Sequence, residues 1–348
     1  MVVLLERHFS DQSLGLLEGV CCVSAFPPRV EGTIEVGFVN NMPDAALEST
    51  ERQFIGLLAE ASGKMELRVK MFYMPQIERG DLAGRRLHAV YNDVGRLFEA
   101  KLDGLIVTGM EPGARALCRE PFWPNFTDLI EWAGRHTTST IWSCLAAHAA
   151  VLYCDQIERR KFPHKCFGVF ECVQDSDHPL LAGAPASGFV PHSRWNDVPT
   201  DALVAAGYQI LAKSREIGAD IFIKDARSLF VFLQGHPEYE AMTLLREYRR
   251  DVGRYLRGES EIYPAVPSSY LNATSERSLE AFRTSALAAR NPDLLETFPI
   301  VAPRDRLTNS WRARALRLYR NWLISLATRG GKSVQTLASV TRLDGTAG

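Results

Sequence analysis

The chain has 348 residues, of which 46% are hydrophobic and 23% charged, and 40 Lys and Arg residues nearly balance 41 Asp and Glu residues. This composition is typical of a globular protein that buries a substantial core. The net charge of −1 disfavours a nucleic-acid or membrane-surface partner, and no apolar run reaches the length of a membrane span. The N-terminus also lacks a secretory signal pattern, so we expect a cytoplasmic protein that acts on small molecules.

The seven cysteines contain no Cys-x-x-Cys pair, and their odd number leaves one without a partner. This pattern disfavours a disulfide framework and a four-thiolate zinc site. We therefore expect reduced thiols and no metal site.

The sequence pattern of the first half of the chain predicts strands that alternate with helices. Strands are expected at 33–40, 65–74, 104–109 and 138–144, and helices at 46–62 and 122–135. Such alternation is typical of an α/β fold in which a parallel central sheet carries helices on both faces.

The pattern changes after residue 160. Three strands at 208–214, 219–226 and 228–235 are separated by short turns, which indicates an antiparallel or mixed edge, and an amphipathic helix follows at 238–258. We divide the chain into an N-terminal extension (1–31), a catalytic domain (32–258) and a C-terminal segment (259–348). An aromatic helix expected at 310–328 packs either on the core or on a second subunit, which leaves a homodimer as one expectation.

A lone thiol lies at the junction between a strand and a helix, in "TSTIWSCLAAHAAVL". Ligands bind beyond the carboxyl ends of parallel strands, and a helix N-terminus favours the thiolate of Cys144 and stabilises an oxyanion beside it. The ordinary alternative is a buried, inert cysteine.

The stretch "FVFLQGHPEYEA" supplies partners for a nucleophile. His236 follows an apolar strand and can point toward the same crevice, and Glu238 can reach the second ring nitrogen of the imidazole. The alternative is a histidine in a turn with a glutamate that caps a helix.

These motifs resemble the class I glutamine amidotransferase-like superfamily, and more closely its homoserine O-succinyltransferase/O-acetyltransferase family of methionine biosynthesis. Matching stretches run in order through the chain, among them "VGFVNNMP", "DGLIVTG", "HKCFGVFE", "VPHSRWND" and "GHPEYEAMTLLREYRRD". The resemblance implies the flavodoxin-like sandwich of that superfamily.

The resemblance also implies roles for individual residues. Cys144 matches the nucleophile that carries the acyl group as a thioester, His236 matches the general base and Glu238 matches its partner. Lys165, Ser193 and Arg250 match substrate-binding positions. Glu247 lies three residues before Arg250 and therefore on the same helix face, where a carboxylate and a guanidinium can hold an amino acid. Without the resemblance, a solvated, salt-bridged helix face is the simpler interpretation of "REYRRD".

The chain departs from the family pattern at several points. The amidotransferase elbow is Gly-x-Cys-x-Gly, whereas this chain has Trp142 and Ala146 at the two glycine positions around Cys144, which disfavours glutamine hydrolysis. The lysine after "NxMP" is missing, and Trp195 follows "PHSR" where the family often has a smaller aromatic residue. In the family, a Gly or Glu in the loop after "VTG" tracks succinyl or acetyl donors; Gly113 aligns best with the glycine, but Glu111 lies two residues away, so the donor stays open.

The sequence thus predicts an acyltransferase that moves a succinyl or acetyl group from its co-substrate, succinyl-CoA or acetyl-CoA, to the hydroxyl of homoserine, with no bound cofactor. Two alternatives remain: the same chemistry on serine or another hydroxy amino acid, in a divergent family member, and a cysteine amidase.

Overall fold

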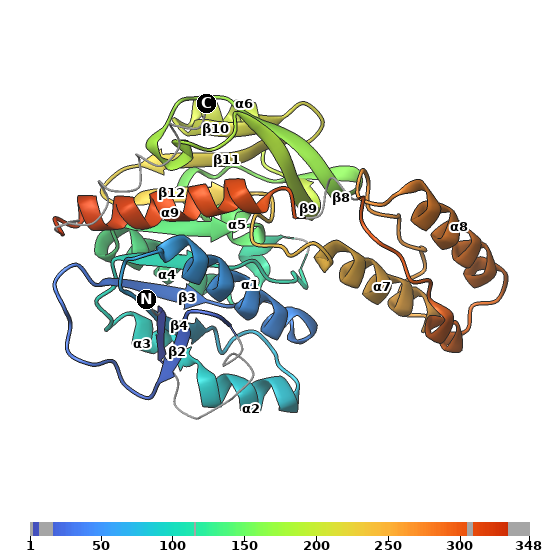
Figure 1. Ribbon diagram of the computed structural model, residues 1–348, viewed down its shortest axis with the longest axis horizontal. Helices are drawn as coiled ribbons and strands as arrows, with labels where there is room; N and C mark the ends of the chain where they lie inside the picture. Colours follow the sequence, from blue (N-terminus) through green and yellow to red (C-terminus); the bar gives the residue numbers. More distant parts are fainter. Residues whose placement is uncertain (1–2, 7–16, 115, 305–308, 333–348) are drawn as a thin grey trace, which may run out of the picture.

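The computed structural model describes residues 3–6, 17–114, 116–304 and 309–332. Its strands form one sheet in the order β2-β1-β4-β3-β6-β7-β12-β11-β10-β8-β9 (Figure 1). The parallel part contains β1 (Val3–Glu6), β2 (Val20–Val23), β3 (Ile34–Val39), β4 (Leu67–Tyr73), β6 (Gly104–Val107), β7 (Ser139–Ser143) and β12 (Leu229–Leu233), and the short β5 (Asn92–Asp93) pairs with β4.

The sheet becomes antiparallel beyond β12. This part contains β8 (Arg160–Gln174), β9 (Ser187–Asp197), β10 (Gln209–Ser214) and β11 (Gly218–Asp225). The long β8–β9 hairpin was not among the predicted strands. β12 runs parallel to β7 and antiparallel to β11, so the predicted mixed edge begins at the strand that precedes His236.

Helices cover both faces of the sheet, which confirms the predicted α/β class (Figure 1). They are α1 (Asp44–Ser62), α2 (Asp81–Val90), α3 (Val94–Leu97), α4 (Trp123–His136), α5 (Leu145–Asp155), α6 (Thr200–Ala205), α7 (Thr243–Leu256), α8 (Ala273–Ala288) and α9 (Arg312–Arg329), with short 3-10 turns at Leu117–Arg119, Pro179–Leu181 and Pro292–Thr297. One buried cluster joins the sheet to α1 and α9, and a second joins the other face to α4 and α5.

The predicted C-terminal helix packs on the core of its own chain. Trp322 of α9 is fully buried, and its indole N–H donates to the Ser139 hydroxyl at 2.9 Å. Burying an aromatic side chain of this size stabilises the fold by about 2–3 kcal/mol before packing terms. The structure holds one chain, so the homodimer stays a prediction, as do the domain boundaries.

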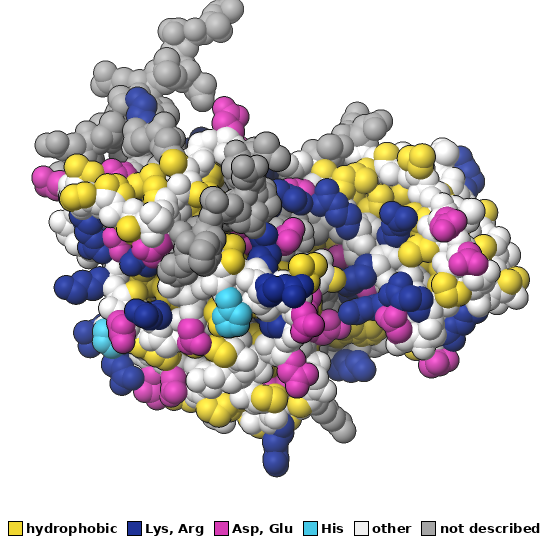
Figure 2. Space-filling model, turned by 90° about the horizontal axis from the view of Figure 1, so that it is seen from below, with side chains coloured by type: hydrophobic (Ala, Val, Ile, Leu, Met, Phe, Trp, Pro, Cys, Tyr) yellow, Lys and Arg dark blue, Asp and Glu magenta, His cyan; other side chains and the backbone are white. Residues whose placement is uncertain are grey.

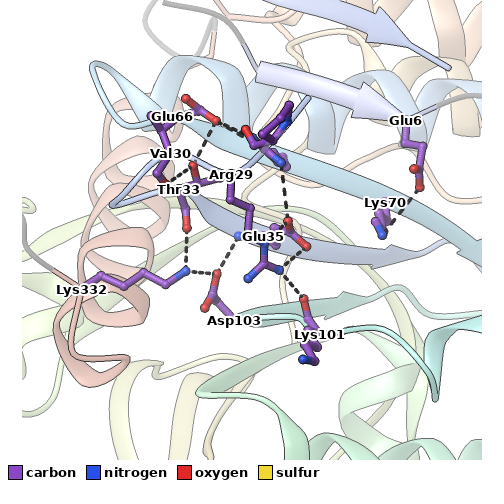
Figure 3. A network of polar contacts seen from close by, with 12 residues as sticks. Glu6, Arg29, Val30, Thr33, Glu35, Glu66, Lys70, Lys101, Asp103 and Lys332 are labelled. Carbon is purple, nitrogen blue, oxygen red and sulfur yellow. Dashed lines mark hydrogen bonds and ion pairs between the residues drawn. The ribbon is translucent and has the colours of Figure 1, made fainter. Parts of the chain in front are cut away.

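The amino ends of the central strands are joined by a polar network (Figure 3). Arg29 donates to Glu35 at 2.7 Å, and the Lys332 ammonium, just past α9, contacts Asp103. The Glu35 backbone N–H also donates to Asp103 at 2.7 Å. The N-terminal segment, β3 and the end of α9 are thus connected at the edge opposite to Cys144.

A lobe formed by α7, α8 and the Pro292–Thr297 turn projects from this body, on the right of Figure 1 and of Figure 2. Its own apolar cluster contains Tyr248, Leu279 and Trp311. The segment between α7 and α8 lies against β8, where Ser268 exchanges backbone hydrogen bonds with Phe167 and Val169. Gly168 makes this contact possible, since its φ is +148° and a Cβ there would lie 2.4 Å from the Ser268 carbonyl oxygen.

Candidate active site

Cys144 occupies a strained turn between β7 and α5. Its φ is 54° and its ψ is −115°, and its N–H donates to the Leu233 carbonyl at 2.7 Å. Such a backbone conformation in a non-glycine residue costs about 1–3 kcal/mol and is tolerated where surrounding structure enforces it. The side chain, predicted at a strand end, is partly exposed there as a nucleophile requires.

The start of α5 provides backbone donors beside the thiol. Ala147 and His148 donate their N–H groups to the Cys144 carbonyl, whereas the helix itself offers no acceptor to Leu145 and Ala146. Gly109 lets the loop after β6 approach this turn, since a Cβ on it would lie 3.0 Å from the Leu145 nitrogen. Donors in this position suit a developing oxyanion on an acyl group attached to sulfur.

The structure brings the three predicted reactive side chains together. His236 lies in the turn after β12, and its Nδ1 is 2.8 Å from Glu238 Oε1. Both side chains are buried, and the imidazole hydrogen-bonds the Cys144 thiol. The carboxylate therefore orients the ring while the other ring nitrogen faces the sulfur.

Electrostatics favour a protonated His236. Burial lowers its pKa, but the negative charges and hydrogen bonds of Cys144 and Glu238 outweigh burial and raise the pKa of His236 well above its ordinary value. An imidazolium beside a thiolate is the arrangement that activates a cysteine nucleophile.

Glu247, on α7, is held beside this group of side chains. It accepts a hydrogen bond from the Ser193 hydroxyl at 2.6 Å and another from the Tyr239 hydroxyl. The Tyr239 ring stacks on the His236 imidazole with centroids 4.3 Å apart. Tyr239 thus connects the reactive histidine to the predicted substrate-binding carboxylate.

Lys165 and Arg250 meet at a shared carboxylate. The Lys165 ammonium lies 3.1 Å from one Asp251 oxygen, and the Arg250 guanidinium donates twice to the other at 3.0 and 2.9 Å. Burial raises the pKa of Asp251, but the two cations outweigh burial and hold it below its ordinary value. Two positive groups are therefore fixed on one side of the site, and Glu247 contributes a negative group from the same helix.

The two candidate donor-specificity residues lie in the loop after β6. Glu111 is exposed and pairs with Arg254 of α7 at 3.3 Å. Gly113 is exposed, and the N–H of the following Ala114 donates to Glu120 at 2.6 Å. The loop thus spans from the lobe to the start of α4.

A buried polar cluster supports the turn that carries His236. A Cβ on Gly235 would lie 2.6 Å from Asp220 Oδ1 and 2.8 Å from His192 Nε2, so only glycine lets this turn rest on the pair. Burial lowers the pKa of His192 to about 4, so this imidazole is neutral at physiological pH.

Cys172 joins His192 and Asp220 in a buried group whose potential metal-ligating atoms lie within 4.8 Å of one another. Arg194 donates to His192 at 3.3 Å, and both Arg194 and Arg314 act on the Asp220 carboxylate. Two guanidiniums oppose a divalent cation there, which favours a structural role. The expectation of no metal site stays a prediction.

Tyr239 and Asp251 are the site residues that sequence reasoning missed. Each directly follows a residue that the motifs identified, Glu238 and Arg250, so proximity in the sequence was the available signal. Their contacts depend on how α7 packs against β8 and β9, which the sequence pattern did not predict.

The fold and the site together define an α/β protein in which a cysteine, a histidine and a glutamate are in contact at the carboxyl edge of a mostly parallel sheet. A solved glutamine amidotransferase from Methylobacillus flagellatus is 15% identical, with a TM-score of 0.47, and the match covers 85% of this chain and 96% of that one.

The sequence comparisons identify the family within this class. The family model for homoserine O-succinyltransferase matches residues 30–329. A homoserine O-succinyltransferase of Rhodopseudomonas palustris is 48% identical over 85% of this chain and 89% of its own length. One from Methylorubrum extorquens is 45% identical over 92% of this chain and 94% of its own length.

The chain belongs to the homoserine O-succinyltransferase family. This confirms the predicted resemblance and the predicted acyltransferase class. Every helix among the described residues is too short or too polar to cross a membrane.

Proposed function

We propose that the protein transfers the succinyl group of succinyl-CoA to the hydroxyl of L-homoserine, through a thioester on Cys144. Its relatives that are 45–48% identical carry the name homoserine O-succinyltransferase. The observation that carries the mechanism is the contact of the Cys144 thiol with His236, whose other ring nitrogen is 2.8 Å from Glu238.

In the first half-reaction, the Cys144 thiolate attacks the thioester carbonyl of succinyl-CoA. The backbone donors at the start of α5 stabilise the oxyanion, the bond to the CoA sulfur breaks, and the His236 imidazolium gives its proton to the departing thiolate. The product is a succinyl-cysteine that keeps the activation of the original thioester.

In the second half-reaction, the hydroxyl of homoserine attacks the succinyl-cysteine. Neutral His236 takes the hydroxyl proton, the carbon–sulfur bond breaks, and the thiolate–imidazolium pair is restored as the ester leaves. Glu238 holds the ring in the required tautomer throughout.

The charged groups on α7 suit an amino-acid acceptor. Arg250 and Lys165 can hold its carboxylate, and Glu247, kept in place by Ser193 and Tyr239, can hold its ammonium. Gly113 and Glu111, both exposed in the loop after β6, are the residues we propose to influence the choice between donors. We further propose a cytoplasmic location, since both substrates are small, soluble metabolites.

Intact-protein mass spectrometry tests the proposal. The enzyme is mixed with succinyl-CoA or acetyl-CoA without acceptor, alongside Cys144→Ala and, as a matched control, Cys154→Ala, which removes an exposed thiol at the far end of α5. We expect a gain of one succinyl group in the wild type and in Cys154→Ala but not in Cys144→Ala. Homoserine should discharge the label faster than serine.

Labelling that persists in Cys144→Ala would contradict the thioester. Preferential labelling by acetyl-CoA would contradict succinyl-CoA as the donor, and faster discharge by serine would contradict homoserine as the acceptor. If neither succinyl-CoA nor acetyl-CoA labels the protein and glutamine is hydrolysed instead, the amidase alternative holds.

A further inference from the structure

A hollow of about 740 Å³ opens at the amino end of β8, outside the site described above. Its lining includes Leu117 and His148 and, from the start of β8 and the end of β9, Arg159, Lys161, Trp195 and Asn196. Its lining is therefore partly apolar and partly cationic.

The elements that line this hollow also carry the reactive site. His148 lies one helical turn after Cys144 on α5, and Leu117 follows the loop that contains Gly113. Lys161 pairs with Asn196 near the open end of the β8–β9 hairpin, and Lys165 and Ser193 lie closer to its turn. The elements that line the hollow are thus the ones that also carry the nucleophile and follow the predicted donor loop.

The cations of the hollow come from a basic run at the start of β8. Arg159, Arg160 and Lys161 are consecutive, and the acidic side chain that the described residues contribute to the lining is Glu158. Arg159 is half-buried, and the Glu120 carboxylate, which accepts the Ala114 N–H, acts on it electrostatically. A fixed guanidinium and a mobile ammonium suit phosphate oxygens.

Trp195 offers an aromatic surface at the same place. Its side chain is 51% exposed, a large fraction for an indole, and the Lys161 ammonium lies 5.7 Å from its ring centroid. An exposed indole beside cations is suited to stack on a purine while neighbouring charges hold phosphates.

We propose that this hollow is the binding site for the nucleotide end of the acyl-CoA co-substrate, which we call the nucleotide pocket. Lys161 and Arg159 bind the phosphates, Trp195 stacks on the adenine, and the pantetheine arm passes Leu117 and His148 toward Cys144. This inference rests on the proposed function, because it locates the binding site of the donor in that reaction.

The test compares two donors that carry the same acyl group. Succinyl-CoA has the nucleotide, and the succinyl thioester of pantetheine lacks it. The variants are Trp195→Ala and Lys161→Glu. Matched controls are Phe189→Ala, which removes an exposed aromatic side chain elsewhere on β9, and Lys64→Glu, which reverses an exposed charge next to α1.

We expect Trp195→Ala and Lys161→Glu to raise KM for succinyl-CoA by roughly 5- to 100-fold, the range of one lost base stack. The kcat/KM for the pantetheine thioester should change less than twofold, and the control variants should behave as wild type with both donors. An equal fall in kcat/KM with the two donors, or an unchanged KM for succinyl-CoA, would overturn the nucleotide pocket.

Calorimetric titration with CoA itself separates this inference from the proposed function. Binding to the wild type that Lys161→Glu weakens at least tenfold supports the pocket even if no transfer to homoserine occurs. Equal binding to both proteins overturns the pocket, and it leaves the proposed transfer to be judged by the labelling of Cys144.

Discussion

The α/β body and the α7–α8 lobe hold the two halves of the site by different means. The body fixes Cys144 through its backbone, in a turn enforced by a hydrogen bond to Leu233 and by helices packed on both faces. The lobe contributes Glu247 and Arg250 from a partly exposed helix, and their positions depend on side-chain hydrogen bonds and ion pairs.

This difference separates chemistry from recognition. The nucleophile cannot move without disrupting the sheet, whereas acceptor-binding groups on α7 can be exchanged without changing the body. We therefore expect substitutions in the body to change turnover and substitutions in the lobe to change the affinity for the acceptor. His236 and Glu238 lie on the chain that connects the two.

The largest effect is expected from His236→Asn. Without a base to move protons in either half-reaction, kcat should fall by roughly 10²- to 10⁴-fold while the melting temperature changes little. Steady-state kinetics with calorimetric melting checks this. His88→Asn, which alters a histidine on α2 far from the site, is the matched control, and a comparable loss there would contradict the assignment.

Glu238→Gln should cause a smaller loss and a change in pH dependence. The carboxylate helps to keep the pKa of His236 raised, so removing its charge lowers that pKa. The imidazolium that protonates departing CoA then loses its proton at a lower pH. The alkaline limb of the pH–rate profile for acyl-enzyme formation therefore moves to lower pH. Rapid-quench labelling across a pH series measures this, and an unmoved limb would show that Glu238 does not act on the ring.

Arg250→Ala should weaken acceptor binding with acylation preserved. Losing the guanidinium should raise KM for homoserine by about 10- to 100-fold, because a charged hydrogen-bonded contact to the substrate is removed. The rate of Cys144 succinylation without acceptor should stay within twofold of wild type. Arg249→Ala, which removes the exposed neighbouring guanidinium, should change neither quantity.

Gly168→Ala should loosen the lobe from the body. The added Cβ meets the Ser268 backbone at a φ of +148°, so we expect a loss of about 1–3 kcal/mol in the free energy of unfolding. Limited proteolysis should cleave between α7 and α8 before the body. Gly84→Ala, where a Cβ inside α2 meets nothing within 4 Å, should lower neither stability nor resistance to proteolysis, and the helical alanine should add about 0.5–1 kcal/mol.

The smallest effect is expected from Glu111→Gln. The Arg254–Glu111 pair is exposed on both sides, so its loss should change the free energy of unfolding by less than about 1 kcal/mol. Chemical denaturation measures this. A changed ratio of succinyl-CoA to acetyl-CoA turnover in the same variant would support a role in donor choice, and an unchanged ratio would favour Gly113 alone.

The sequence predicted the body better than the lobe for a physical reason. Strands such as 33–40 and 138–144 are buried on both faces, so their apolar runs are unmistakable and the structure places strands there. The β8–β9 hairpin alternates irregularly, and a register shift interrupts it between Lys161 and Cys166, so periodicity gave no clear signal.

The candidate site shows the same division. Cys144, His236 and Glu238 are placed by strand ends and short sequence separation, which a sequence pattern can reveal. Tyr239 and Asp251 act through contacts with α7 and β8 that depend on tertiary packing. The nucleotide pocket arises from the Arg160–Lys161 pairing with Asn196 and Asp197, which no local pattern indicated.

The position of α9 has a consequence for how the protein is made. Its buried residues, Trp322 among them, cover one face of the sheet, and the strands of that sheet are all synthesised before α9. Until α9 has emerged from the ribosome, that face of the sheet stays uncovered. The contact between Lys332, just past α9, and Asp103 joins residues 229 positions apart. The sheet that carries the nucleophile turn is therefore covered on this face only after α9 has been synthesised, and a chain that stalls before α9 leaves apolar surface exposed, which favours aggregation.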